Sequence, residues 1–186
     1  MMFFDHNAAN LLEKFGLALT WKFLYLGYKG IGYTQYLSKQ AIEEYGTFLL
    51  ETGSYSSNEE MYLIVQLASA RIESLECCST LEQLIKYDRF DDIYGEDKWY
   101  IVIMDQVVCH MSDDPTDALL SVSNEWARMG CPDTLAHLIQ GIVDKKPAPL
   151  YYTADTLIDI KSKIRAWISE KRSLISDYER PRQQDT

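Results

Sequence analysis

Apolar residues recur at helical spacing along nearly the whole chain. In the stretch 58–75, for example, the apolar positions are Met61, Ile64, Val65, Ala68, Ile72 and Leu75, and most of the intervals between them are three or four residues. No stretch shows the sustained two-residue alternation of a half-buried strand. The pattern predicts an all-α fold of eight or nine antiparallel helices, in one compact bundle or a short HEAT-like stack of helix pairs.

Two serine–glutamate pairs match the capping box that marks a helix start. Ser57 is followed three residues later by Glu60, and Ser79 is followed in the same way by Glu82. In this motif the two side chains satisfy backbone amides that the first helical turn leaves free. Helices are therefore expected to begin directly after Ser57 and Ser79.

The stretch from Trp99 to Met111 is apolar nearly all round, which is typical of a central helix packed on several sides. Its β-branched residues (101–103) would also suit a strand, but its length and lack of turn residues favour a helix. Asp114 followed by Pro115 predicts the start of the next helix. Gly130 suits a left-handed helix end, and a further helix is expected to begin at 132–133.

Residues 1–186 are expected to form a single helical domain. The prolines at 147 and 149 disfavour helix in the residues before them, which gives a possible break at 145–150. A long C-terminal helix is expected over 154–179, with a stripe of apolar residues that includes Leu174. The polar tail, 180–186, is expected to fray.

The chain is acidic, with a net charge of −10. Nucleic-acid binding depends on cationic side chains, and an acidic field also repels anionic membranes, so neither is expected as a partner. No apolar run is long enough to span a bilayer, and no basic N-terminal segment marks a secretory signal. A soluble, cytoplasmic protein with reduced cysteines is therefore expected.

No motif in the sequence points to a metal, a cofactor or a catalytic centre. The chain has only three histidines, His6, His110 and His137, and none has zinc-site spacing. The glycine-rich segment 27–32 fits neither phosphate-loop fingerprint and is interpreted as a turn between helices. A Cys109–His137 or Cys131–His110 dyad stays open, because catalytic pairs meet in space rather than in sequence. The chain is nevertheless expected not to be an enzyme.

Two groups of acidic side chains remain as candidate contacts for a basic partner. Helix capping accounts for Asp97, Asp114 and Asp117, and no calcium-loop spacing is present. Three other aspartates, Asp88, Asp91 and Asp92, follow the end of a predicted helix. The helix dipole disfavours negative charge there, so these three are the stronger candidates for binding a partner. The full candidate partner-binding set is Asp88, Asp91, Asp92, Glu96, Asp97 and Asp113.

The segment 19–29, Leu-Thr-Trp-Lys-Phe-Leu-Tyr-Leu-Gly-Tyr-Lys, resembles the opening of the bacterial domain-of-unknown-function 2247 family. Members of that family begin with a Thr/Ser-Trp helix followed by a glycine-bearing turn. The segments 99–103, 114–126 and 129–133 resemble the family's later Trp-containing helix and its Gly-x-Pro helix start. Together these motifs cover most of residues 17–150.

The family has no established activity, so no catalytic residues are carried over. It resembles small proteins found beside bacterial polymorphic or contact-dependent toxins, which implies an immunity role. The leading hypothesis is therefore a non-catalytic immunity protein, monomer or homodimer, that binds and neutralises a basic toxin domain. One alternative is a helical scaffold or adaptor that self-associates, and another is an enzyme whose cysteine or carboxylate site is assembled only in the fold.

Overall fold

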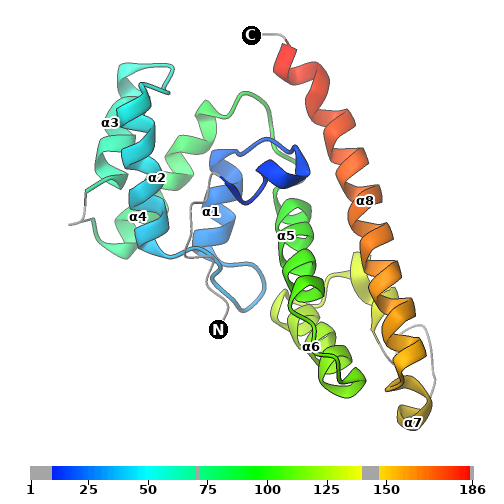
Figure 1. The fold of residues 1–186 in the computed structure, drawn as a ribbon. Coiled ribbons are helices and arrows are strands. Elements are labelled where there is room, and N and C mark those ends of the chain that lie inside the picture. Colours follow the sequence, from blue (N-terminus) through cyan, green and yellow to red (C-terminus); the bar gives the residue numbers. More distant parts are fainter. Residues whose placement is uncertain (1–9, 70–71, 140–146, 185–186) are drawn as a thin grey trace. The chain divides into compact units, whose positions relative to one another are not determined.

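The computed structural model describes residues 10–69, 72–139 and 147–184 (Figure 1). Over these residues the chain is all-α and has no β-strand, which confirms the predicted fold class. Its eight α-helices are α1 (Trp21–Lys29), α2 (Lys39–Thr52), α3 (Asn58–Leu67), α4 (Ser74–Leu84), α5 (Gly95–Cys109), α6 (Pro115–Arg128), α7 (Ala148–Tyr151) and α8 (Ala154–Gln184). Short 3-10 turns, η2 (Glu13–Phe15), η3 (Ile85–Tyr87) and η4 (Asp133–Leu138), lie between or before them.

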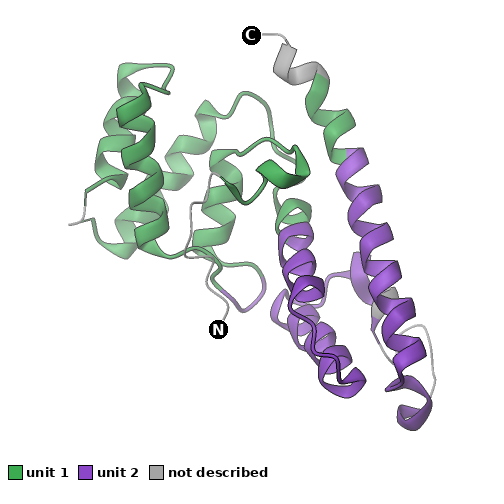
Figure 2. Ribbon diagram, viewed as in Figure 1, with its two compact units in different colours: residues 1–31, 35–99, 175–186 green, residues 32–34, 100–174 purple. Residues whose placement is uncertain are grey.

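The chain divides into two compact units (Figure 2). Unit 1 comprises residues 1–31, 35–99 and 175–186, and unit 2 comprises residues 32–34 and 100–174. Helices α5 and α8 therefore contribute residues to both units. The expected break at 145–150 falls partly outside the described residues, and its described part leads into α7.

In unit 1, α1 packs against α4, α4 against α3, and α3 against α2. The centre of this unit is Trp99, which is fully buried and stacks on Phe23 with ring centroids 4.3 Å apart and planes 3° from parallel. Its indole Nε1 donates a hydrogen bond of 2.7 Å to the Phe23 carbonyl. Gly27 lies against the same ring, where an added Cβ would be 2.1 Å from Trp99 Cζ2, so the position admits only glycine.

In unit 2, the part of α5 that directly follows Trp99, residues 100–104, is buried. Ile101, Val102 and Ile103 are each at most 1% exposed within a continuous helix, which confirms the helical prediction for this β-branched stretch. A close backbone approach joins the turn at residues 32–34 to the end of α6. There an added Cβ on Gly32 would lie 2.3 Å from the backbone nitrogen of Gly130, and both glycines have positive φ.

Of the two predicted capping boxes, one forms in part and the other is wrong. Ser57 does begin α3, because its side chain accepts a hydrogen bond of 3.1 Å from the Glu60 amide, but the Glu60 carboxylate accepts from Ser56 and from the Trp21 indole instead of from the Ser57 amide. Ser79, however, lies inside α4, where its hydroxyl donates to the Glu76 carbonyl, and α4 begins after Glu73. The same residue spacing occurs within helices because a serine hydroxyl can bond a carbonyl one turn earlier.

Other boundaries confirm or correct the expectations. Asp114 caps α6 and Gly130 adopts the left-handed conformation, as predicted. The periodic stretch 58–75 is two helices, since α3 ends at Leu67 and α4 begins at Ser74. Helix α8 continues to Gln184 rather than ending at 179, and Leu174 is 48% exposed while its neighbour Ile175 is fully buried.

Candidate functional site

Asp88 caps helix α1 from a distant part of the chain. Its Oδ1 accepts a hydrogen bond of 2.6 Å from the Trp21 amide, and its Oδ2 accepts one of 3.0 Å from the Lys22 amide. These are amides that the first turn of α1 leaves free, and the positive end of the helix dipole favours the carboxylate there. The prediction that capping does not explain Asp88 is therefore wrong, because it considered only the helix that Asp88 follows.

Asp92 is buried beside the same helix start. Its Oδ2 accepts a hydrogen bond of 2.5 Å from the Thr20 hydroxyl, which in turn caps α1 by accepting from the Phe23 amide. The Lys98 ammonium lies 2.8 Å from the same oxygen. Asp92 is only 1% exposed, so the expectation that its carboxylate lies on the surface for a partner is wrong.

Lys98 is the centre of a buried ionic network within unit 1. Its side chain is 0% exposed, and its Nζ lies 2.7 Å from Glu179 Oε1 on α8, in addition to its contact with Asp92. The ammonium also donates to the Ala18 carbonyl at 2.9 Å, while the Ala18 amide donates to Glu179 Oε2. The ammonium thus donates hydrogen bonds to Asp92 and Ala18 and forms an ion pair with Glu179, although Glu179 Oε1 is left without a hydrogen-bond donor. These contacts join the segment before α1 to α5 and to the end of α8.

The other predicted contact residues lie apart from this network or at its edge. Asp91 is exposed, its carboxylate lies 3.7 Å from the Lys22 ammonium, and its carbonyl accepts a hydrogen bond from the Tyr178 hydroxyl. Glu96 and Asp97 occupy the first turn of α5, Glu96 exposed and Asp97 half-buried. Asp113 is exposed and belongs to unit 2, whereas the other five predicted residues belong to unit 1.

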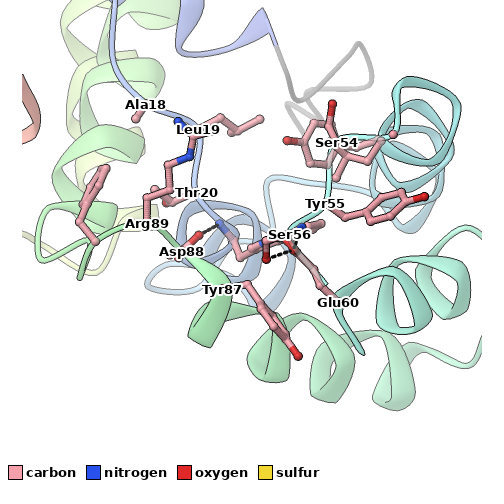
Figure 3. Close-up of a pocket in the computed structure, with 15 residues that line it drawn as sticks. Ala18, Leu19, Thr20, Ser54, Tyr55, Ser56, Glu60, Tyr87, Asp88 and Arg89 are labelled. Carbon is pink, nitrogen blue, oxygen red and sulfur yellow. Dashed lines mark hydrogen bonds between the residues drawn. The ribbon is translucent and has the colours of Figure 1, made fainter. Parts of the chain in front are cut away.

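Next to Asp88, unit 1 contains a cleft of about 770 Å³ (Figure 3). Three segments form it: the approach to α1, the connection between α2 and α3, and the residues around the end of η3. Its aromatic lining residues are Trp21, Tyr45, Tyr55, Tyr87 and Phe90. Its charged lining residues are Glu60, Asp88 and Arg89.

Glu60 and Trp21 hold one wall of the cleft in place. Glu60 is buried, and its Oε1 accepts a hydrogen bond of 3.3 Å from the Trp21 indole. Its Oε2 accepts from both the amide and the hydroxyl of Ser56, at 2.6 and 2.7 Å. The Trp21 ring meets Tyr45 edge-on with centroids 5.8 Å apart, and burial raises the pKa of the Tyr45 hydroxyl to about 12. The wall is therefore rigid and its aromatic surface is fixed.

The Asp88 carboxylate lies in an environment that solvates charge poorly. Its pKa is raised to about 6, chiefly by burial and also by nearby Asp92. Hydrogen bonds from the Trp21 and Lys22 amides act in the opposite direction and lower it. At neutral pH the group is mostly ionised, but its negative charge is less well compensated than that of an aspartate in water.

The remaining chemistry of the described residues is sparse. They contain no group of three or more histidine, cysteine, aspartate or glutamate side chains placed to hold a metal ion. Cys77 is fully buried, and burial raises its pKa to about 11, so its thiol is protonated at neutral pH.

Neither predicted cysteine–histidine dyad is tested. The His110 ring lies 2.9 Å from the Gln106 carbonyl, and the Cys109 thiol lies 3.8 Å from an Asp105 carboxylate oxygen. The side chain of His137 lies outside the described part of the chain, so the Cys109–His137 dyad stays a prediction. Cys131 and His110 are both described and exposed, and nothing in the described structure tests a catalytic role for them.

The ionic network was not predicted, although the sequence carries a signal for part of it. Glu179 falls four residues after the buried Ile175, on the apolar stripe of α8, and Lys98 directly precedes a long apolar run. Charged residues at such positions are buried only when paired. No pattern in the sequence indicates the cleft, because residues 54–56 and 87–90 are far apart along the chain and meet only in the fold.

Among the helices that the structure describes, none is long and apolar enough to cross a membrane. The fold and site define a class of helical protein with an internal ionic network and an open cleft of aromatic and acidic side chains. The family model described as "Uncharacterized protein conserved in bacteria (DUF2247)" matches residues 9–172, and the chain belongs to this family. No curated protein and no solved structure matches significantly.

The family match confirms the resemblance drawn from the segments 19–29 and 99–133. The association with toxins stays a prediction.

Proposed function

We propose that this protein is a non-catalytic binding protein of the immunity type, which binds a basic toxin domain and blocks it. The observation that carries the proposal is the aromatic and acidic cleft of unit 1, on a chain with a net charge of −10. Aromatic side chains in a concave site supply much of the energy of protein recognition. A strongly acidic field accelerates association with a cationic partner.

The roles of the carboxylates around the cleft also favour binding over catalysis. Asp88 accepts from two backbone amides, Glu60 accepts from Ser56 and from the Trp21 indole, and Asp92 is buried against Lys98. A general acid or base must reach the proton that it transfers. Glu60 and Asp92 instead maintain the shape of the site, while Asp88 stabilises the start of α1 and keeps acceptor positions for a bound cation.

The direct test is co-expression with the protein encoded by the neighbouring gene. A toxin domain encoded there is expected to stop bacterial growth alone, and this chain is expected to restore growth and to co-purify with it. Because the attraction is electrostatic, the association rate is expected to fall as ionic strength rises. A neighbouring gene without toxin activity, or a toxin that forms no complex at moderate salt, would contradict the proposal.

Self-association is the second candidate, and two exposed apolar side chains favour it. Tyr62 on α3 is 63% exposed and Leu75 on α4 is 85% exposed, and contact with a second copy would bury these side chains. Light scattering distinguishes the candidates. A dimer that dissociates on Leu75→Ser would support the scaffold function, whereas a monomer would exclude it.

A further inference from the structure

We propose that the cleft of unit 1 is a receptor for one arginine side chain presented by a basic protein. This inference rests on the proposed function in one respect only, which is that the protein carrying the arginine is a toxin domain. The recognition itself depends on the cleft's aromatic faces, its carboxylates and its size (Figure 3).

The aromatic lining suits a planar cation. Rings attract cations over their faces, and a guanidinium adds stacking to this attraction. Tyr55 is 38% exposed and supplies the most accessible ring. Tyr87 and Phe90 are half-buried, and each already has a lysine ammonium over one face, at 4.8 Å for Lys86 and 5.7 Å for Lys98, so only their opposite faces are left for a ligand. Trp21 and Tyr45 lie deeper, held edge to face. A volume of about 770 Å³ is in the range of sites that bury a small ligand, and is ample for an arginine side chain with its adjoining backbone.

Asp88 supplies the anionic partner. An ionised carboxylate offers about four acceptor positions, and the Trp21 and Lys22 amides occupy two of them. The remaining capacity matches the paired donors of a guanidinium. Burial has also raised the pKa of Asp88 to about 6, so a cation entering the cleft would compensate a charge that the protein leaves poorly solvated.

Arg89 provides a way to distinguish this ligand from an anion. Its side chain is exposed and lines the same cleft (Figure 3). If the cleft receives a cation, Arg89 repels the ligand, and Arg89→Ala strengthens binding. If the cleft receives a carboxylate or phosphate, Arg89 attracts it, and the same change weakens binding. The sign of the effect therefore decides between the two ligand classes.

The test uses capped pentapeptides, Gly-Gly-Arg-Gly-Gly with the arginine replaced in turn by citrulline or glutamate, titrated into the full chain. Binding is followed by the NMR signal of the Trp21 indole N–H, identified by its loss in Trp21→Phe. We expect the arginine peptide to bind at least tenfold more tightly than the citrulline peptide, which has the same shape without the charge. Equal binding of these two peptides, or tighter binding of the glutamate peptide, would overturn the proposal.

Two matched pairs of variants locate the site. Tyr55→Ser is expected to weaken binding of the arginine peptide about threefold through loss of one exposed ring, while Tyr62→Ser on α3, outside the cleft, leaves it unchanged. Arg89→Ala is expected to strengthen binding severalfold. Arg165→Ala makes the same charge change at an exposed position of unit 2 and controls for net charge. Equal effects within either pair would show that the peptide binds elsewhere.

The peptide experiment and the toxin experiment can each give a negative result without the other. A chain that neutralises a toxin but does not prefer the arginine peptide would refute the arginine receptor and keep the proposed function. A chain that binds the arginine peptide in the cleft but no neighbouring toxin would keep the receptor and refute the proposed function.

Discussion

Replacing Lys98 by methionine tests the buried ionic network. Methionine fills nearly the same space, but it leaves the carboxylates of Asp92 and Glu179 buried without their cation, at 1% and 2% exposed. Breaking a buried pair by removing one partner costs about 3–5 kcal/mol. The Ala18 carbonyl also loses its donor, but Asp92 keeps the Thr20 hydroxyl and Glu179 keeps the Ala18 amide. We therefore expect a loss of about 4 kcal/mol at pH 7.

The assay is urea unfolding followed by far-ultraviolet circular dichroism. With a slope of about 2 kcal/mol/M, the midpoint of Lys98→Met should fall by about 2 M while the slope stays the same. Lys163→Met is the matched control. Lys163 pairs with Asp159 at 2.7 Å on the exposed face of α8, and losing such a pair changes stability by at most about 1 kcal/mol.

A triple variant completes the test. Combining Lys98→Met with Asp92→Asn and Glu179→Gln removes the uncompensated charges, so it should recover much of the loss. If Lys98→Met loses no more stability than Lys163→Met, the network does not exist as described.

Three other substitutions test individual contacts. The pKa of Asp88 is about 6 in the folded chain and 3.8 ordinarily, so the folded chain binds this proton more tightly. The resulting contribution to the free energy of unfolding, up to about 3 kcal/mol, is present below pH 3.8 and is lost as the pH rises through about 6. Asp88→Asn should remove that part of the pH dependence, and an unchanged difference between the urea midpoints at pH 4 and 7 would contradict the assignment. Gly27→Ala forces a methyl group into the Trp99 ring and should cost about 1–3 kcal/mol in thermal unfolding, more than Gly46→Ala in α2, where the nearest atom lies 3.3 Å from the added Cβ. Ser57→Ala should cost about 1 kcal/mol by removing the α3 cap, and no change in melting temperature would show that water replaces the cap.

Local chemistry determined much of what the sequence could predict. The caps at Ser57 and Asp114 depend on hydrogen bonds that span two or three residues, so the local sequence could predict them. The Ser79 box failed because a serine inside a helix satisfies the same spacing with a different bond. The all-α class was predicted from helical periodicity over many residues, so an error at one helix boundary does not change the predicted class.

The candidate site was less predictable because it depends on long-range contacts. Asp88 caps a helix that begins 67 residues earlier, and no local pattern contains that distance. Asp88, Asp91 and Asp92 all contact the start of α1 or its neighbours. The sequence singled them out as contacts for a partner, and these internal roles of Asp88 and Asp92 were not predicted. The aromatic cleft required the fold itself.

The position of Glu179 has a consequence for how the protein is made. Ribosomes add about 5–20 residues per second. Glu179 follows Lys98 by 81 residues, so roughly 4–16 s pass between the synthesis of the lysine and that of its second carboxylate. During this interval unit 1 has only Asp92 to balance the buried ammonium. The ionic network of unit 1 therefore cannot be complete before residue 179 has been synthesised.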